Sequence, residues 1–421
     1  MAFESVYFIM KEVEMGWAFR SFHINVANFM FFCLYLHVGR GLYYGSFRMY
    51  GVWASGVSLL LLVMLTAFTG YVLPWGQMSY WAAQVISSMV TAIPVVGKDV
   101  AIWIWGGYAV GNVTLKRLFS VHFIFPFVMV GLAVLHLAFL HTTGSGNPLG
   151  VDTGCSLVRF HSFYSVKDLV GVMVGGLALC FMVGFFPYVL VDGESFIPCD
   201  YMDTPSSIHP EWYFLFAYAI LRSVPSKAGG IILMLCSIVV LFFVPELWCG
   251  IKESLGNYFF CQILYWVWVA NFCVLTVVGS QSVEEPFITS GEKMTIFYFM
   301  FFPIMGVVQW LEDNSFSLVA KLMNTTDRPH LVWFWDEHFC EWRYDYSPSF
   351  GGHLFKDETF WEFFEAEDGS SMDESWRFSD NLIKVKHVNK ALGKVPYGWQ
   401  GLWDDEMRGR SIRRLRNMGI L

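Results

Sequence analysis

Seven long apolar segments constrain this chain more than any other feature of its sequence. Crossing the hydrocarbon core of a bilayer takes roughly 17 to 25 apolar residues in a helix. Because lipid offers the backbone no hydrogen-bond partner, each segment must satisfy its own amides, and we expect all of them to be helices. The predicted spans are Ser21–Gly39, Val52–Leu73, Leu118–Leu140, Leu169–Leu190, Ile231–Leu247, Phe259–Gly279 and Met294–Leu311.

Charge is distributed unevenly along the chain. Residues 1–312 hold 13 of the 27 basic and 17 of the 35 acidic residues, so half of the charge lies in the last quarter of the chain. The overall charged fraction of 15% excludes an ordinary soluble enzyme. A net charge of −8 without a basic face excludes a nucleic-acid-binding protein. The sequence predicts an all-α integral membrane protein with seven transmembrane helices and a polar C-terminal extension.

Two connections between the predicted spans are long. Residues 74–117 are apolar but interrupted by Pro74 and Pro94, which favours short helices at the membrane interface. Residues 191–230 are rich in proline and are expected to form an ordered extramembrane loop. The Lys and Arg residues are spread over both sets of loops, so charge bias does not settle the orientation.

Four of the eleven histidines lie within or at the edges of the first and third predicted spans. His23 and His37 are 14 residues apart, and so are His122 and His136. Fourteen helical residues rise about 21 Å and rotate about 40° short of four turns, so each helix presents two imidazoles on one face. With one helix between them the two spans run in the same direction. We therefore expect His23 to face His122 at one depth and His37 to face His136 at the other.

Paired imidazoles inside a membrane favour a metal-binding function, because neutral imidazole is a suitable axial ligand for haem iron. The alternative is four separate buried histidines, which leaves their equal spacing to coincidence. Gly56 and Gly70 in the second span are also 14 residues apart and are expected to let a flat ligand approach, although ordinary small-residue packing is an alternative. Arg20, three residues before His23, and Arg40, three residues after His37, are expected to lie within reach of haem propionates, with ordinary positively charged span ends as the alternative.

Several motifs follow one another along residues 5–311. They comprise the stretch from Arg20 to Gly45, Thr66–Met78, Ile102–Gly107, His122–Pro126, His141–Gly150 and Pro210–Pro225. Together they closely resemble cytochrome b, the dihaem subunit of ubiquinol–cytochrome c reductase (complex III). The 14-residue interval and the fusion of the last three helices to the first four resemble the cytochrome c-reducing branch.

The resemblance implies a function and a setting. His23 and His122 would ligate a low-potential haem b near the outer surface, and His37 and His136 a high-potential haem b near the inner one. Ubiquinol would be oxidised on the outer side, electrons would cross the membrane, and ubiquinone would be reduced on the matrix side, with proton translocation. The implied location is the mitochondrial inner membrane. The implied partners are the Rieske iron–sulfur protein, cytochrome c1, accessory subunits, membrane lipids and a second copy of the chain.

The resemblance also implies two quinone sites. Glu211 would accept a proton from quinol, since a carboxyl group among aromatic walls should have a raised pKa; a solvated loop carboxylate is the alternative. Tyr71 and Tyr218 would orient the quinol ring. The remaining residues of this quinol-oxidation set are Phe68, Gly76, Pro210, Trp212 and Tyr213. The quinone-reduction set is His141, Ser145, Lys167 and Asp168, although interfacial anchoring is an alternative for the lysine.

The chain departs from the family pattern in several places. Ala82 stands where the family has glycine. Its methyl group should narrow the quinol-oxidation pocket and so reduce sensitivity to bulky strobilurin-type inhibitors. Gly146 stands where the family has the first of two asparagines. The family's first transmembrane helix has no counterpart here, and we expect a separate short membrane chain to replace it.

The predicted organisation has three parts. Residues 1–190 form an incomplete haem-binding bundle, residues 191–312 the C-terminal cytochrome b part, and residues 313–421 an extension with no counterpart in the family. The extension is rich in tryptophan and ends in a basic segment, Arg408–Arg416. We expect it to pack against accessory subunits on the inner side, with lipid contact of the basic end as the alternative.

Two other functions fit parts of the pattern. A dihaem membrane anchor for a dehydrogenase would lack the Pro-Glu-Trp-Tyr loop at residues 210–213 and the last three helices. A haem-free scaffold or channel would need neither histidine pair. A reduced-minus-oxidised spectrum and antimycin-sensitive quinol–cytochrome c activity discriminate among the three.

Overall fold

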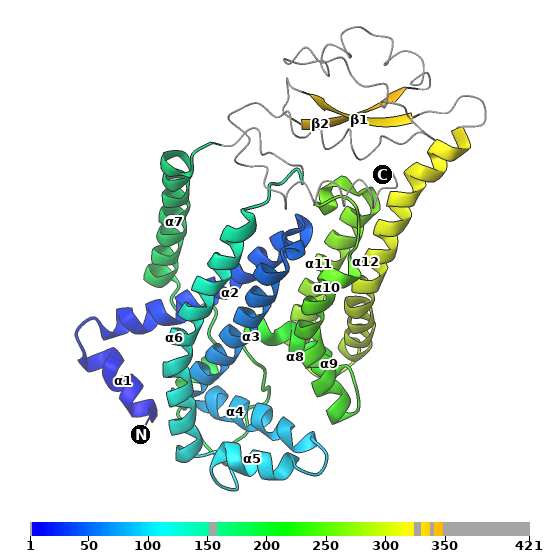
Figure 1. The fold of residues 1–421 in the computed structure, drawn as a ribbon. Helices are drawn as coiled ribbons and strands as arrows, with labels where there is room; N and C mark the ends of the chain where they lie inside the picture. The colour runs from blue at the N-terminus through cyan, green and yellow to red at the C-terminus, as the bar shows by residue number, and fades with distance from the viewer. Residues whose placement is uncertain (1, 151–157, 324–329, 337–340, 348–421) are drawn as a thin grey trace. The chain divides into compact units, whose positions relative to one another are not determined.

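The structure is a computed structural model that describes residues 2–150, 158–323, 330–336 and 341–347. Seven helices in these residues are long and apolar enough to cross a membrane, which confirms the predicted all-α membrane fold. They are α2 (Gly16–Tyr43), α3 (Tyr50–Val72), α6 (Asn112–Thr143), α7 (Phe160–Phe185), α9 with η6 and α10 (Lys227–Leu247), α11 (Phe259–Gly279) and α12 (Phe287–Met323) (Figure 1).

The observed helices match the predicted spans except at their ends. The third helix extends to Asn112 and Thr143, beyond the apolar segment on both sides. The fourth ends at Phe185 rather than at the predicted Leu190, because Pro187 cannot continue a helix. The added turns are more polar, which suits residues that leave the hydrocarbon core for the interface.

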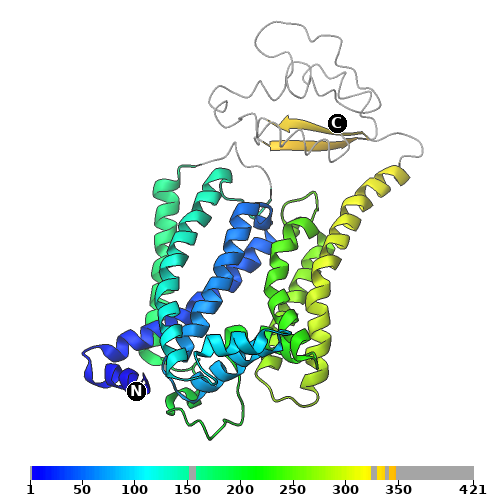
Figure 2. The ribbon, with the colours of Figure 1, turned by 60° about the horizontal axis from the view of Figure 1, so that its bottom comes forward.

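Shorter helices occupy the connections. The predicted interfacial segment forms α4 (Gln77–Met89), η2 (Val90–Ala92) and α5 (Gly97–Trp105), which lie across one end of the long helices (Figure 2). The loop after α7 contains η4 (Gly193–Phe196), η5 (Trp212–Phe214) and α8 (Leu215–Arg222). The remaining short elements of the membrane part are α1 (Ala2–Glu12), η1 (Ser46–Arg48), η6 (Val240–Phe243), α10 (Val244–Leu247) and η7 (Leu255–Asn257), with α9 itself spanning Lys227–Val239.

Residues 1–150 and 161–310 form one compact unit. Its largest apolar core lies where α3, α8, α9 and α11 meet α12, around fully buried Phe301, Phe302 and Trp248. Two buried tryptophans there donate their indole N–H groups to backbone carbonyls: Trp53 to Leu241 at 2.6 Å and Trp248 to Phe302 at 2.9 Å. These bonds satisfy polar groups that lipid could not.

The second unit comprises residues 151–160 and 311–421. Its described strands, β1 (His330–Asp336) and β2 (Glu341–Ser347), pair antiparallel with His330 opposite Ser347. This pair adds strands to a fold otherwise predicted as helical. The basic segment Arg408–Arg416 lies outside the described residues, so the expected contacts of the extension stay a prediction.

Candidate functional site

The two histidine pairs face each other as the sequence predicts. On α2 and α6, the ring centres of His23 and His122 lie 6.1 Å apart, with the ring planes at 81°. The ring centres of His37 and His136 lie 6.4 Å apart, with the planes at 58°. The parallel course of α2 and α6 therefore brings all four imidazoles together as two pairs.

Their spacing fits a metal ion held between two rings. A metal–imidazole bond of about 2 Å on each side places the ring centres about 6 Å apart. Among the described residues no group of three or more His, Cys, Asp or Glu side chains could hold a metal ion. Two protein ligands on opposite sides, without a third, suit an iron whose other ligands come from a porphyrin.

The glycines of α3 lie against imidazoles of α6. A Cβ atom on Gly70 would lie 2.3 Å from Cε1 of His122, and one on Gly56 would lie 3.1 Å from Cε1 of His136. The sequence predicted room for a flat ligand at these positions. In the structure the imidazole rings of His122 and His136 lie against these glycines, because α3 packs directly on α6; the room for a flat ligand stays a prediction.

Two α6 histidines have partners that orient the ring. Nδ1 of His122 lies 2.9 Å from the carbonyl oxygen of Thr66, so it donates its proton there. Nδ1 of His136 lies 2.9 Å from Oγ of Ser55, whose own proton goes to the carbonyl oxygen of Gly51 at 2.7 Å. With the proton held on Nδ1, each ring presents a lone pair on Nε2 for a metal.

His37 has a different partner. Nη2 of Arg40 lies 3.2 Å from Nδ1 of His37, and Nη1 lies 3.4 Å from Oγ of Ser46. Because a guanidinium only donates, Nδ1 must accept here. Ligation of a metal through Nε2 therefore requires Arg40 to turn away from the ring. A contact between Arg40 and a haem propionate would turn it away in this manner. Arg20 lies half-buried one turn before His23.

The Pro210–Tyr213 loop is anchored on α2. The indole N–H of Trp212 donates to Oδ1 of Asn28 at 2.8 Å. Tyr213 is buried and its ring stacks on Phe31, with centres 4.0 Å apart and planes at 2°. Tyr35 donates its hydroxyl proton to the carbonyl oxygen of Tyr213. These contacts hold the loop rigidly beside the membrane bundle.

Glu211 directly precedes η5 and is half-buried, and its side chain makes no hydrogen bond to the start of that helix. The pKa of its carboxyl group is raised to about 7, because burial raises it more than the hydrogen bond with the Tyr71 side chain lowers it, and the negative charge of Asp192 adds to the rise. The Tyr71 hydroxyl also lies 3.3 Å from Oγ of Ser195. A carboxyl group that titrates near neutrality can take up a proton and pass it on.

Other members of the predicted quinol-oxidation set surround the same loop. Tyr218 donates its hydroxyl proton to the carbonyl oxygen of Ile208 at 3.2 Å, so it secures the loop before Pro210. Phe68 packs against the apolar cluster that includes Val72 and Trp75. Gly76 lies against η4, where a Cβ atom would be 2.6 Å from the carbonyl oxygen of Ser195.

The predicted quinone-reduction residues are not joined in the structure. His141, Ser145, Lys167 and Asp168 are all exposed. The Lys167 ammonium lies 5.9 Å from the ring centre of Phe163. Within residues 2–150 and 158–315, no hydrogen bond or ion pair links the four side chains, so this site stays a prediction.

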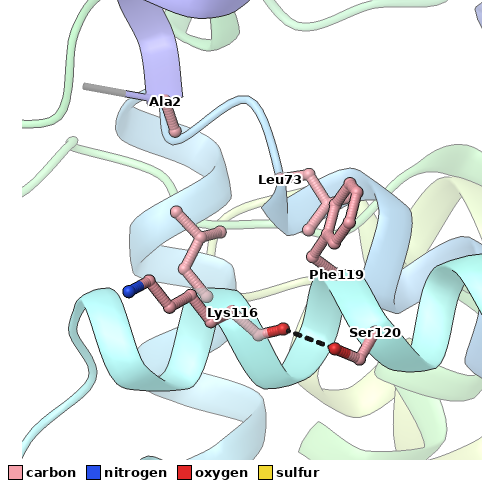
Figure 3. A pocket seen from close by; sticks show the side chains of 6 residues that line it. Ala2, Leu73, Lys116, Phe119 and Ser120 are labelled. Atoms are coloured by element: carbon pink, nitrogen blue, oxygen red, sulfur yellow. Dashed lines mark hydrogen bonds between the residues drawn. The ribbon is translucent and has the colours of Figure 1, made fainter.

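A hollow of about 390 Å³ lies between the start of α1, the end of α3 and the start of α6 (Figure 3). It is lined by Ala2, Leu73, Leu115, Lys116, Phe119 and Ser120. None of these belongs to the predicted site residues. Its open, mostly apolar lining is typical of a crevice that faces lipid.

Sequence reasoning missed the groups that orient the site. Ser55 and Thr66 are ordinary helix residues in sequence, and their contacts with α6 depend on helix packing. Asp192 and Ser195 lie in a loop far along the chain from Tyr71. The available signals were the position of Ser55 beside Gly56 and that of Thr66 at the start of the Thr66–Met78 motif.

A multi-pass helical bundle with facing imidazoles on neighbouring helices defines the class of membrane cytochromes. Comparison with known families makes this specific. Residues 1–144 match the family described as cytochrome b/b6/petB, and residues 198–299 match the family described as cytochrome b (C-terminal)/b6/petD. The chain belongs to the cytochrome b family.

A solved structure supports the same assignment. The chain is similar to one described as a hyperthermophilic respiratory Complex III, with 29% identity and a TM-score of 0.69. The match covers 74% of this chain and 84% of that one. The likeness therefore extends over most of the membrane part.

Proposed function

We propose that this chain is the cytochrome b subunit of a ubiquinol–cytochrome c reductase. The observation that carries the proposal is the pair of imidazole sites at 6.1 and 6.4 Å. Membership of the cytochrome b family and similarity to a respiratory Complex III support it. Haem b bound between each pair would supply one-electron carriers at two depths in the membrane.

The residues around Glu211 have the properties that quinol oxidation requires. Oxidation of quinol releases protons into a cavity with little water, so a base that titrates near neutrality must receive them. Glu211 has a pKa of about 7 and accepts a hydrogen bond from Tyr71. Tyr71 and Tyr218 would orient the quinol ring, and the aromatic side chains of the loop would exclude water.

On the opposite side, His141 and Asp168 would deliver protons to quinone as it is reduced. His141 lies in the last turn of α6 and Asp168 lies within α7, directly before the apolar segment; both side chains are exposed, so they can exchange protons with water. The proposed setting is the mitochondrial inner membrane. The proposed partners are the Rieske iron–sulfur protein, cytochrome c1, accessory subunits and a second copy of the chain.

The test uses the complex purified from its native membranes. We expect two b-type bands in the reduced-minus-oxidised spectrum and quinol–cytochrome c turnover that antimycin inhibits. Bands without this turnover would favour a dihaem anchor of a dehydrogenase. A colourless preparation would favour a haem-free scaffold or channel.

A further inference from the structure

A second titratable pair lies beside Glu211. Nε2 of His209 lies 3.3 Å from Oδ2 of Asp192, and the two side chains are 29% and 23% exposed. Oδ1 of Asp192 accepts the backbone N–H of Glu194 at 2.8 Å, as the cap of η4. The carboxylate is therefore fixed in place and keeps one oxygen directed to the imidazole.

The ring of His209 has an acceptor at each nitrogen. Nε2 faces the carboxylate of Asp192, and Nδ1 lies 3.4 Å from the carbonyl oxygen of Pro210. Because both partners only accept, both contacts are satisfied only when each ring nitrogen carries a proton. The doubly protonated ring thus makes a contact that the neutral ring lacks.

This pair connects with Glu211 through two short segments. His209 precedes Glu211 by two residues. Tyr71 bonds both to Glu211 and to Ser195 in η4, the element that Asp192 caps. The negative charge of Asp192 also contributes to the raised pKa of Glu211. Asp192 therefore interacts with both of the other groups: it contacts His209 directly and acts on Glu211 through its charge.

On the basis of the proposed function, we propose that His209, held by Asp192, carries the proton of Glu211 to water after quinol oxidation. The O–H bond of protonated Glu211 breaks while an N–H bond forms on the neutral imidazole, directly or across one water molecule. The imidazolium then releases a proton to solvent and returns to its neutral form. Only a proton moves, and Glu211 is left ionised for the next quinol.

Few other charged or titratable groups surround this relay. Tyr71 comes from α3, Glu194 from η4, and Tyr213 from η5. Tyr218 comes from α8, and the guanidinium of Arg222 lies 5.2 Å from its ring centre. None of these groups bonds to the His209 ring in the described part of the chain. In the described part of the chain, the partners of the His209 ring are therefore Asp192 and the carbonyl oxygen of Pro210.

The test measures quinol–cytochrome c turnover of the whole complex between pH 6 and 8, with haem spectra as the check on assembly. For His209→Ala we expect turnover to fall on the order of 10-fold, with an unchanged KM for quinol. Added imidazole should restore turnover in His209→Ala and leave Glu211→Gln unaffected. Asp192→Asn should lower turnover in the same way, while Asp200→Asn, an equal loss of charge on the same loop, should not.

Two results would overturn the relay: turnover of His209→Ala equal to that of the unsubstituted complex, or a loss that imidazole does not restore. A loss expressed as a raised KM would also overturn it, because it would show a role in quinol binding. If the unsubstituted complex oxidises no quinol, the proposed function itself fails.

Discussion

Gly70 lies against the imidazole of His122, so closely that a Cβ atom would be 2.3 Å from Cε1 of the ring. Gly56 has the same relationship to His136 at a looser 3.1 Å. The two glycines and the two histidines repeat at the same interval because α3 and α6 pack along their length. The histidine sites thus depend on three helices, although the histidines themselves lie on α2 and α6.

We predict that Gly70→Ala abolishes one b-type band and leaves the other. The added methyl cannot fit unless the ring or the helix moves, and overpacking of this kind typically costs about 1–3 kcal/mol. Gly56→Ala should have the milder effect: the other band should remain, and the redox potential of the haem that gives it should shift. Spectra recorded during a redox titration measure both.

Gly131→Ala provides the control for these variants. Gly131 lies on α6 between the two histidines, and a Cβ atom there would meet nothing within 4 Å. Its spectrum should match that of the unsubstituted protein. Equal loss of colour in Gly70→Ala and Gly131→Ala would contradict the role assigned to the glycines.

Ser55→Ala should weaken the hold on the haem at the His136 site alone. The hydroxyl keeps the proton of His136 on Nδ1, and loss of such a partner typically costs roughly 10–100-fold in metal affinity. Haem retention after detergent treatment measures the effect for each band. Ser58→Ala removes a hydroxyl that bonds only to the carbonyl oxygen of Ala54 and should retain both haems; matching losses in the two variants would refute this account.

Quinol oxidation should speed up as the pH rises through about 7. Glu211 must be ionised to accept a proton, and its pKa is raised to about 7, so the active form predominates above that pH. In Glu211→Gln the rate should fall on the order of 10²-fold and lose this dependence. Rates of haem reduction with antimycin present give the profile. An unchanged profile in the variant would assign the titration to another group.

Ala82→Gly should make turnover more sensitive to strobilurin-type inhibitors. Ala82 is buried on α4, where it is 7% exposed, so its methyl group occupies packed space. Removal of the methyl should admit bulkier molecules while quinol turnover stays nearly the same. Inhibition curves for the two proteins test this, and equal inhibitor potency would show that residue 82 does not restrict access.

Much of the fold could be predicted because lipid leaves an apolar segment few options. The histidine pairing also followed from sequence, since a 14-residue interval places two side chains on one helix face. The orienting partners did not follow, because Ser55 and Thr66 meet α6 only through helix packing. The contact of Arg40 with His37 likewise depends on a choice between rotamers. Asp192 and His209 are brought together by a loop whose course no local pattern determines.

The most direct test replaces each ligating histidine in turn and records the reduced-minus-oxidised spectrum of the complex. Substitution of His23 or His122 should remove one b-type band, and substitution of His37 or His136 should remove the other. This pairwise pattern follows from the ring separations of 6.1 and 6.4 Å. Retention of both bands in any of the four variants would contradict the proposed haem sites.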